Sequence, residues 1–283
     1  MTSNANARPH DASADHMALE AKGPITYLGS FLKKALVITE LEALKLRHDP
    51  SELLTRAIQP VLWLLVFGEV LTQVRAIPTG DIPYIDFMTP GVLAQSVLFI
   101  SIFYGISIVW ERDLGIVQKF LASPAPRTAI VAGKALSAGL RSLSQALIVF
   151  ILALLIGVSV ILNPLNLLLV VLVVLLGAAI FSTLSLIIAC MVKTRDRFMG
   201  IGQMITMPLF FASNAIYPIS LMPDWLKLIA YVNPLTYVVD ALRGLMVVGG
   251  VSEYGILTDL IILVAVAAAL IGIGGRLYAR VGQ

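Results

Sequence analysis

The chain has 283 residues, of which 58% are hydrophobic and 13% are charged, and its mean hydropathy is +0.91. Soluble domains contain about 45–50% apolar residues, so this composition indicates an integral membrane protein and excludes a soluble enzyme or binding domain. The formal net charge of +3 does not indicate nucleic-acid binding, because the basic residues lie mostly in short segments between apolar runs, where they set membrane topology.

The first 48 residues are predicted to hold a polar tail and one amphipathic helix. Residues 1–24 are polar and lack the apolar core of a cleavable signal peptide, so we expect a disordered tail on the side of synthesis. Residues 25–48 place apolar side chains at steps of three and four, with lysines and a glutamate off this stripe. This pattern predicts a helix that lies in the membrane interface.

Six apolar runs are long enough to cross a membrane as helices. A bilayer core about 30 Å thick needs about 20 residues of helix. The runs that meet this requirement are about 55–74, 88–110, 135–158, 165–190, 199–217 and 255–275. The sequence therefore predicts an all-α integral membrane protein with six transmembrane helices.

Residues 110–136 place charges and prolines between the second and third runs. Glu111, Arg112 and Asp113 are predicted to start a short amphipathic helix over 111–122, and the prolines at 124 and 126 end it, because proline lacks the amide proton. Periodicity alone leaves two interpretations open. The segment is either a solvated loop, or a helix that presses against a cytoplasmic partner and passes its movement to the third span.

Residues 217–250 contain two apolar segments that are too short to span a membrane. Asp224 is a candidate N-cap of the first segment, Asn233 followed by Pro234 is a start signal for the second, and Gly244 is a candidate stop. We predict a helical hairpin that dips into the outer leaflet between the fifth and sixth spans.

The distribution of basic residues predicts the orientation of the chain, because short cytoplasmic loops retain lysine and arginine. With the N-terminus inside, the cytoplasmic segments carry most of these residues, including Arg112, Lys134, Arg195 and Arg276. The opposite side carries only Arg75, Lys227 and Arg243. An even number of spans then places both termini in the cytoplasm.

Two stretches in this order carry a resemblance to a known family. WERDLGIVQKFLASPAPRTAIVAGKAL at 110–136, followed by a long third span and by YPISLMPDWLKLIAYVNPLTYVVDALRGL at 217–245, resembles the permease subunits of type-2 ATP-binding-cassette (ABC) exporters. This group includes drug, polysaccharide and nodulation-factor export permeases, and the resemblance runs from about residue 25 to the end. It implies a permease domain over 25–283, in a prokaryotic plasma (inner) membrane.

The resemblance also implies roles for two sets of residues and for two protein partners. The residues that would couple the permease to its ATPase are Glu111, Arg112, Gly115, Phe120, Ser123, Pro124 and Arg127. The residues that would belong to the outward-facing re-entrant hairpin are Asn233, Pro234, Tyr237, Asp240 and Arg243. The partners would be a cytoplasmic ATPase subunit, docked on the helices at 25–48 and 111–122, and a second copy of this chain or a related permease.

We expect no catalytic, cofactor or metal site in this chain. Only Gly133-Lys134 suggests a phosphate-binding loop, but that motif needs glycine at 128 and serine or threonine at 135, where the chain has Thr128 and Ala135. The single cysteine and the three histidines have no metal-ligand spacing. ATP and magnesium are therefore expected on the separate ATPase subunit.

Polar and aromatic residues inside the spans are candidates for a translocation path. They are Glu69, Gln95, Phe99, Tyr104, Gln203, Phe211 and Asn214. A charge at mid-membrane costs about 2.5–3.5 kcal/mol on insertion scales, so Glu69 either faces a cavity or reaches the headgroups. For the other residues the alternatives are hydrogen bonding between helices and ordinary packing or lipid contact.

The sequence thus predicts the transmembrane subunit of an ATP-driven exporter. Its cargo would be an amphipathic drug, a lipid, or a glycan or lipid-linked sugar. Two alternatives stay open, namely a carrier or channel driven by an ion gradient, for which Glu69 is the only candidate carboxylate, and a membrane scaffold that transports nothing.

Overall fold

The computed structural model describes residues 58–74, 77–80, 82–116, 127–192 and 194–278. Within these residues every regular secondary-structure element is a helix. The only β-type pairing among them is an isolated bridge between Val160 and Val247. The prediction of an all-α protein is confirmed. The tail at 1–24, the helix predicted at 25–48 and residues 117–126 lie outside the described residues.

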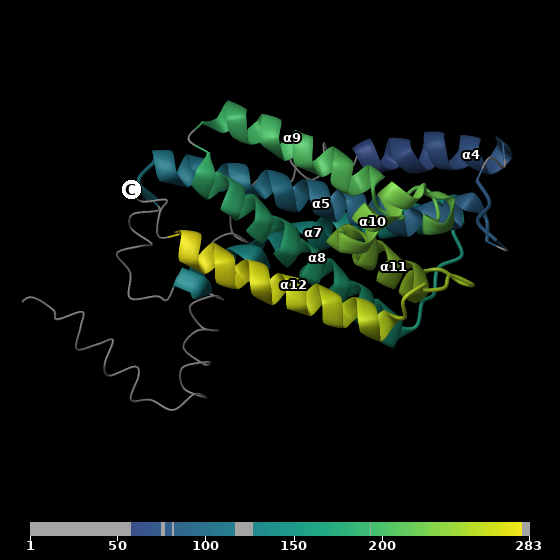
Figure 1. Cartoon of the computed structure of the whole chain (residues 1–283). Helices are drawn as coiled ribbons and strands as arrows, with labels where there is room; N and C mark the ends of the chain where they lie inside the picture. Colours follow the sequence, from purple (N-terminus) through teal and green to yellow (C-terminus); the bar gives the residue numbers. More distant parts are fainter. Residues whose placement is uncertain (1–57, 75–76, 81, 117–126, 193, 279–283) are drawn as a thin grey trace, which may run out of the picture.

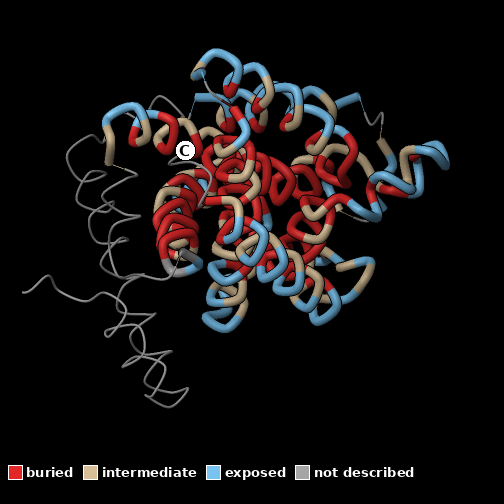
Figure 2. Tube along the Cα trace, turned by 60° about the vertical axis from the view of Figure 1, so that its left-hand side comes forward, coloured by how far each residue is buried: buried red, intermediate tan, exposed pale blue. Residues whose placement is uncertain are grey.

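Four helices are long and apolar enough to cross a membrane: α5 (Tyr84–Asp113), α7 (Arg127–Ile156), α8 (Pro164–Met191) and α12 (Ile256–Leu277). They correspond to the second, third, fourth and sixth predicted spans. Helix α8 contains no charged residue and packs against α5, α7, α11 and α12 (Figure 1), while α5 is the most buried of the four helices. The buried residues gather in the interior of the bundle (Figure 2).

The first and fifth predicted spans are shorter helices. Ile58–Val74 contains a π-helical stretch, η1 (Trp63–Gly68), which leads into α4 (Glu69–Val74). Helix α9 (Arg195–Phe211) has 17 residues and carries Pro208 close to its end, and the chain turns directly after it. Four of the six predicted spans are therefore long enough in the described residues to be membrane spans by length and composition.

The segment predicted as a hairpin contains two short helices, α10 (Asp224–Val232) and α11 (Pro234–Met246), after a 3-10 turn η2 (Ile219–Leu221). Asn233 caps α11, because its side chain accepts a hydrogen bond from the Leu235 amide and Pro234 follows it. Two details differ from the prediction. Pro223, not Asp224, is the N-cap of α10, and α11 continues past Gly244 to Met246.

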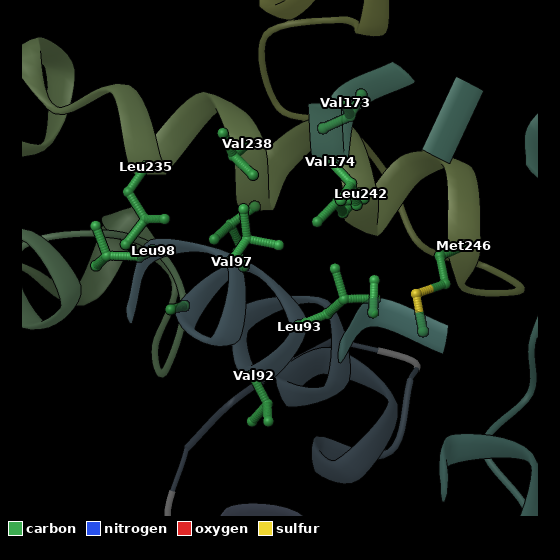
Figure 3. Close-up of a cluster of buried hydrophobic side chains, with 14 of the residues drawn as sticks. Val92, Leu93, Val97, Leu98, Val173, Val174, Leu235, Val238, Leu242 and Met246 are labelled. Atoms are coloured by element: carbon green, nitrogen blue, oxygen red, sulfur yellow. The ribbon is translucent and has the colours of Figure 1, made fainter. Parts of the chain in front are cut away.

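Helix α11 lies inside the bundle and not on its surface. It packs against α5, α8 and α12. Leu235 and Val238 of α11 lie against Leu98 and Val97 of α5 (Figure 3). Between apolar helices in lipid, such close packing is a main source of association, because lipid tails are as apolar as leucine. The segment with α10 and α11 is thereby fixed to the spans by its second helix.

A close approach of two backbones explains Gly91 in α5. A Cβ atom at this position would overlap the backbone carbonyl of Ala215, in the turn after α9. Glycine is the residue that permits this contact.

We expect Gly91→Ala to lower the stability of the protein, by about 1–3 kcal/mol as for other overpacked interiors. Gly200→Ala is the matched control, because a Cβ atom at this position of α9 would meet nothing within 4 Å. Thermal unfolding of both purified variants in detergent measures the difference. Equal melting temperatures for the two variants would show that the contact with Ala215 is not tight.

Candidate functional site

A buried salt bridge joins the end of α5 to α7. Lys134 Nζ on α7 donates to Glu111 Oε2 on α5 at 2.6 Å, and the two side chains are only 2% and 7% exposed. Removing one partner of such a pair leaves an uncompensated buried charge, which costs about 3–5 kcal/mol. The pair therefore holds the end of α5 against the first two turns of α7.

The predicted start of the coupling helix at residue 111 is wrong. Helix α5 continues without a break to Asp113, and Gly115 follows it with a positive φ of 70°. A glycine in this left-handed conformation is a common way to end a helix. Glu111 and Arg112 do not end α5, because both are good helix formers, and Lys134 on another helix neutralises the Glu111 charge.

Three further contacts connect the end of α5 to α8 and α9. Arg112 Nη1 donates to the Val192 carbonyl oxygen, just after α8, at 2.9 Å. Arg195, the first residue of α9, donates from Nη2 to Asp113 Oδ2 at 3.1 Å, and its guanidinium lies 3.3 Å from the centre of the Trp110 ring. The end of α5 is thus joined to α7, α8 and α9.

The other predicted coupling residues follow directly along the chain. Gly115 is the described residue at which the chain leaves α5. Phe120, Ser123 and Pro124 lie outside the described residues. Arg127 is the first residue of α7.

The predicted hairpin residues form contacts at the other end of the bundle. Asn233 Nδ2 donates to the Leu209 carbonyl at 2.7 Å, which satisfies a carbonyl group at the end of α9. Tyr237 donates its hydroxyl proton to the Tyr231 carbonyl at 2.6 Å, and this bond joins α11 to α10.

Asp240 and Arg243 are both buried on α11. Arg243 Nη2 donates to the Asn214 carbonyl at 2.6 Å, and its guanidinium lies 3.9 Å from the centre of the Phe87 ring. Asp240 accepts hydrogen bonds from the Ser252 hydroxyl at 2.9 Å and from the Tyr254 amide at 3.1 Å. Asn214, predicted as a path residue, therefore belongs to this cluster around α11.

A cavity of about 490 Å³ lies between these two ends. Its walls come from the first helix and from α5, α7 and α9. They are Gln59, Pro60, Gln95, Ser96, Phe99, Ile100, Phe103, Ile106, Gln145 and Met199. Small-molecule sites typically have volumes of about 300–1,000 Å³ and mainly apolar walls with a few polar groups. This cavity fits that description, and none of its described lining residues carries a charge.

The cavity contains two of the seven predicted path residues, Gln95 and Phe99. Of the others, Tyr104 is buried beside Arg141, whose guanidinium carbon lies 5.4 Å from the centre of its ring. Three are exposed and do not line the cavity: Glu69, Gln203 and Phe211. Glu69 instead accepts a hydrogen bond from Gln73 at 3.3 Å.

The sequence did not identify Gln145 and Met199 as lining residues. They come from α7 and α9, which only tertiary packing brings to α5. In the part of the chain that the structure describes, no group of three or more histidine, cysteine, aspartate or glutamate residues is placed to hold a metal ion.

The fold places a cavity inside a bundle of apolar helices, and the family of the chain identifies its class. The chain belongs to the ABC-2 type transporter family, whose sequence profile matches residues 34–247. It is thus a transmembrane transport subunit of the ABC type, as the resemblance implied.

Named relatives agree with this family. The putative transport permease ycf38 of Porphyra purpurea is 29% identical, over 73% of this chain and 74% of the relative. The daunorubicin resistance ABC transporter permease protein DrrB1 of Streptomyces coeruleorubidus is 26% identical, over 71% and 70%. The inner membrane transport permease YadH of Escherichia coli K12 is 24% identical, over 72% and 80%.

We expect Lys134→Met to destabilise the protein by about 3–5 kcal/mol, because it leaves the Glu111 carboxylate buried without its cation. The control is Lys227→Met, which removes an ion pair to Asp224, whose side chain is 99% exposed. Exposed pairs contribute little, so this control should unfold like the wild type. Chemical unfolding in detergent measures both variants, and a Lys134→Met curve that matches the control would contradict a buried pair.

Proposed function

We propose that this chain is the transmembrane subunit of an exporter driven by a separate ATPase. Six helices of each chain cross the membrane, namely the four long helices together with Ile58–Val74 and α9. A 17-residue helix is about 25 Å long at 1.5 Å per residue, close to the thickness of the bilayer core. The tail at 1–24 precedes a permease domain at 25–283.

The charges at the two ends of the bundle support an orientation with both termini in the cytoplasm. Arg112, Lys134, Arg195 and Arg276 lie at the end where α5 and α12 finish and α9 begins. Asp259 and Asp224 lie where α12 and α10 begin. By the rule that cytoplasmic segments retain basic residues, the first end is cytoplasmic and the hairpin at 217–250 faces outward. The membrane is the plasma (inner) membrane of a prokaryote.

The observation that carries this function is that the same helices meet at the end of α5 and around the cavity. Glu111, Arg112 and Asp113 connect α5 to α7, to the end of α8 and to α9. Gln95 and Phe99 of α5, Gln145 of α7 and Met199 of α9 line the cavity. A force on the chain just after Asp113 therefore acts on α5, α7 and α9, which form three of the four walls of the cavity.

The ATPase supplies that force at the segment after Asp113 and at the helix predicted over 25–48. It binds ATP and magnesium, and this chain contributes no catalytic residue. Closure of the ATPase can shift the permease only if the docked contacts differ between its two states. A second copy of this chain, or a related permease, completes the transporter beside the exposed apolar side chains of the first helix and α9.

The cavity binds an uncharged amphipathic part of the cargo, and the whole cargo is a drug, a lipid, or a glycan or lipid-linked sugar. The glutamine amides at 95 and 145 can bond to its polar groups, and Phe99, Phe103 and Met199 can contact its apolar part. The name of the relative DrrB1 refers to resistance to daunorubicin, which agrees with an amphipathic cargo. A carrier driven by an ion gradient is less well supported, because Glu69 does not line the cavity.

The test of the function is purification of the tagged chain from its host in mild detergent. We expect a stoichiometric ATPase to copurify, with vanadate-sensitive activity. Phe120→Ala should reduce the bound ATPase at least tenfold without changing the melting temperature of the chain. Trp225→Ala, which removes an exposed aromatic residue of α10, should retain the ATPase.

Recovery of a folded chain with no ATPase would contradict the proposal and would favour a carrier or a scaffold. An ATPase that copurifies but gives no transport in vesicles would identify a scaffold.

The class of cargo can be tested with three photoreactive benzophenones of nearly the same shape. They are neutral 4-(hydroxymethyl)benzophenone, the anion 4-benzoylbenzoate and a (4-benzoylbenzyl)trimethylammonium cation. We expect saturable labelling of Phe99 or Met199 by the neutral probe, at least tenfold above that by the ions, because burying a charge without a partner is costly. Mass spectrometry of peptides locates the label.

Gln145→Leu should weaken binding of the neutral probe about fivefold, since a neutral hydrogen bond contributes about 1 kcal/mol. Gln203→Leu is the control, because Gln203 is exposed on α9 away from the cavity. Equal labelling by the three probes, or label spread over α12, would reject this class of cargo.

A further inference from the structure

Two buried carboxylates share one hydroxyl group at the outer end of the bundle. Asp240 lies on α11, Asp259 lies in the first turn of α12, and Ser252 lies in the loop between these helices. Ser252 Oγ is 2.9 Å from Asp240 Oδ2 and 3.0 Å from Asp259 Oδ2. Asp240 is 1% exposed and Asp259 is fully buried, so water does not separate the groups.

The two short distances need two protons. A serine hydroxyl has one proton and can donate it to only one of the two carboxyl oxygens. The contact between Ser252 Oγ and the second carboxyl oxygen is also at hydrogen-bond distance, so a carboxyl group must supply the proton for it. Two ionised carboxylates on one hydroxyl would also repel each other strongly in a buried place. One of the two aspartates therefore carries a proton.

The hydrogen-bond partners identify which aspartate is neutral. Asp240 also accepts from the Tyr254 amide at 3.1 Å and from the Asn214 amide at 3.4 Å, so three donors stabilise its negative charge. Among the described residues, Asp259 has only Ser252 and the Asp240 carboxyl group itself as side-chain partners, and its Oδ1 is buried without a hydrogen bond. A buried oxygen without a partner is much less costly on a neutral acid than on a carboxylate.

We infer that Asp259 is a proton-binding site: it donates a hydrogen bond to Ser252, which in turn donates to the ionised Asp240. This chain of bonds, the outer proton clasp, joins α11, the loop after it and α12. It adds to the proposed function a site that binds a proton and that does not depend on the identity of the cargo.

The neighbouring ionisable groups do not replace this proton. Arg243 of α11 donates to the Asn214 carbonyl and lies over Phe87, and its charge is close enough to attract the ionised Asp240, although the two form no ion pair within the described residues. Glu253 of the loop adds a further negative charge near Asp240. Tyr237 and Tyr254 are neutral phenols, and Asp86 of α5 accepts from the Ser159 amide. Helix α8 contributes no charged residue.

The outer proton clasp makes the outer end of the transporter sensitive to pH. When the hairpin separates from α12, water reaches Asp259 and the acid can release its proton. The closed arrangement therefore binds more protons than the open one, so its stability falls as the pH rises. A higher pH on the outer side should favour opening of the hairpin.

Infrared difference spectroscopy of the full chain in lipid nanodiscs tests the site. We expect the wild type to show the C=O band of a protonated carboxylic acid, and Asp259→Asn to lack it. Asp224→Asn is the matched control, because Asp224 is an exposed carboxylate of the same hairpin, and this variant should keep the band. Persistence of the band in Asp259→Asn would overturn the inference.

Two further measurements keep the inference testable if Asp259→Asn folds poorly. Ser252→Ala should shift the band to higher wavenumber, because the acid loses its acceptor, and an unshifted band contradicts the proposed chain of bonds. Above about pH 4, the ordinary pKa of an aspartic acid, the wild type should lose at most tenfold in its folding equilibrium constant per pH unit relative to Asp259→Asn, until the acid ionises in the folded protein as well. Parallel pH profiles for the two proteins would refute the clasp.

Discussion

The buried salt bridge between Glu111 and Lys134 is the interaction on which the arrangement of the helices at the end of α5 depends. It neutralises Glu111 in the last turn of α5 and Lys134, which lies seven residues after the start of α7. The two helices are thereby held together at this end. With Arg112 and Arg195 attached to the same turn, the chain after Asp113 leaves from a point that four helices share. A docked ATPase would act at this point.

The opposite end of the bundle is built on a different principle. There Asn233, Asp240 and Arg243 bond to α9, to the turn after it and to the loop before α12, so α11 is held by hydrogen bonds as well as by packing. Asp240 accepts hydrogen bonds from three groups, namely the Ser252 hydroxyl, the Tyr254 backbone amide and the Asn214 side-chain amide. One end of the bundle thus carries a neutralised ion pair and the other a shared proton, with the cavity between them.

Local patterns in the sequence predicted the elements that depend on local chemistry. The fourth and sixth spans were placed within one or two residues, because long uncharged runs have clear ends, and Asn233-Pro234 identified the start of α11. The start of α7 was missed by eight residues, and the end of α5 by three, because hydropathy counts Lys134 and Glu111 as charges although they neutralise each other.

The candidate site was predicted less well, because its contacts join distant parts of the chain. Gln95 and Phe99 were identified, but their neighbours Gln145 and Met199 were not, since no spacing in the sequence relates α5 to α7 and α9.

The most direct test of coupling between the ATPase and the cavity uses Phe99→Cys in a chain with Cys190→Ala, labelled by a water-soluble maleimide with the ATPase bound. ATP should change the labelling rate severalfold, and adding Lys134→Met should abolish that change. An undiminished response to ATP in the Lys134→Met chain would contradict transmission through the end of α5.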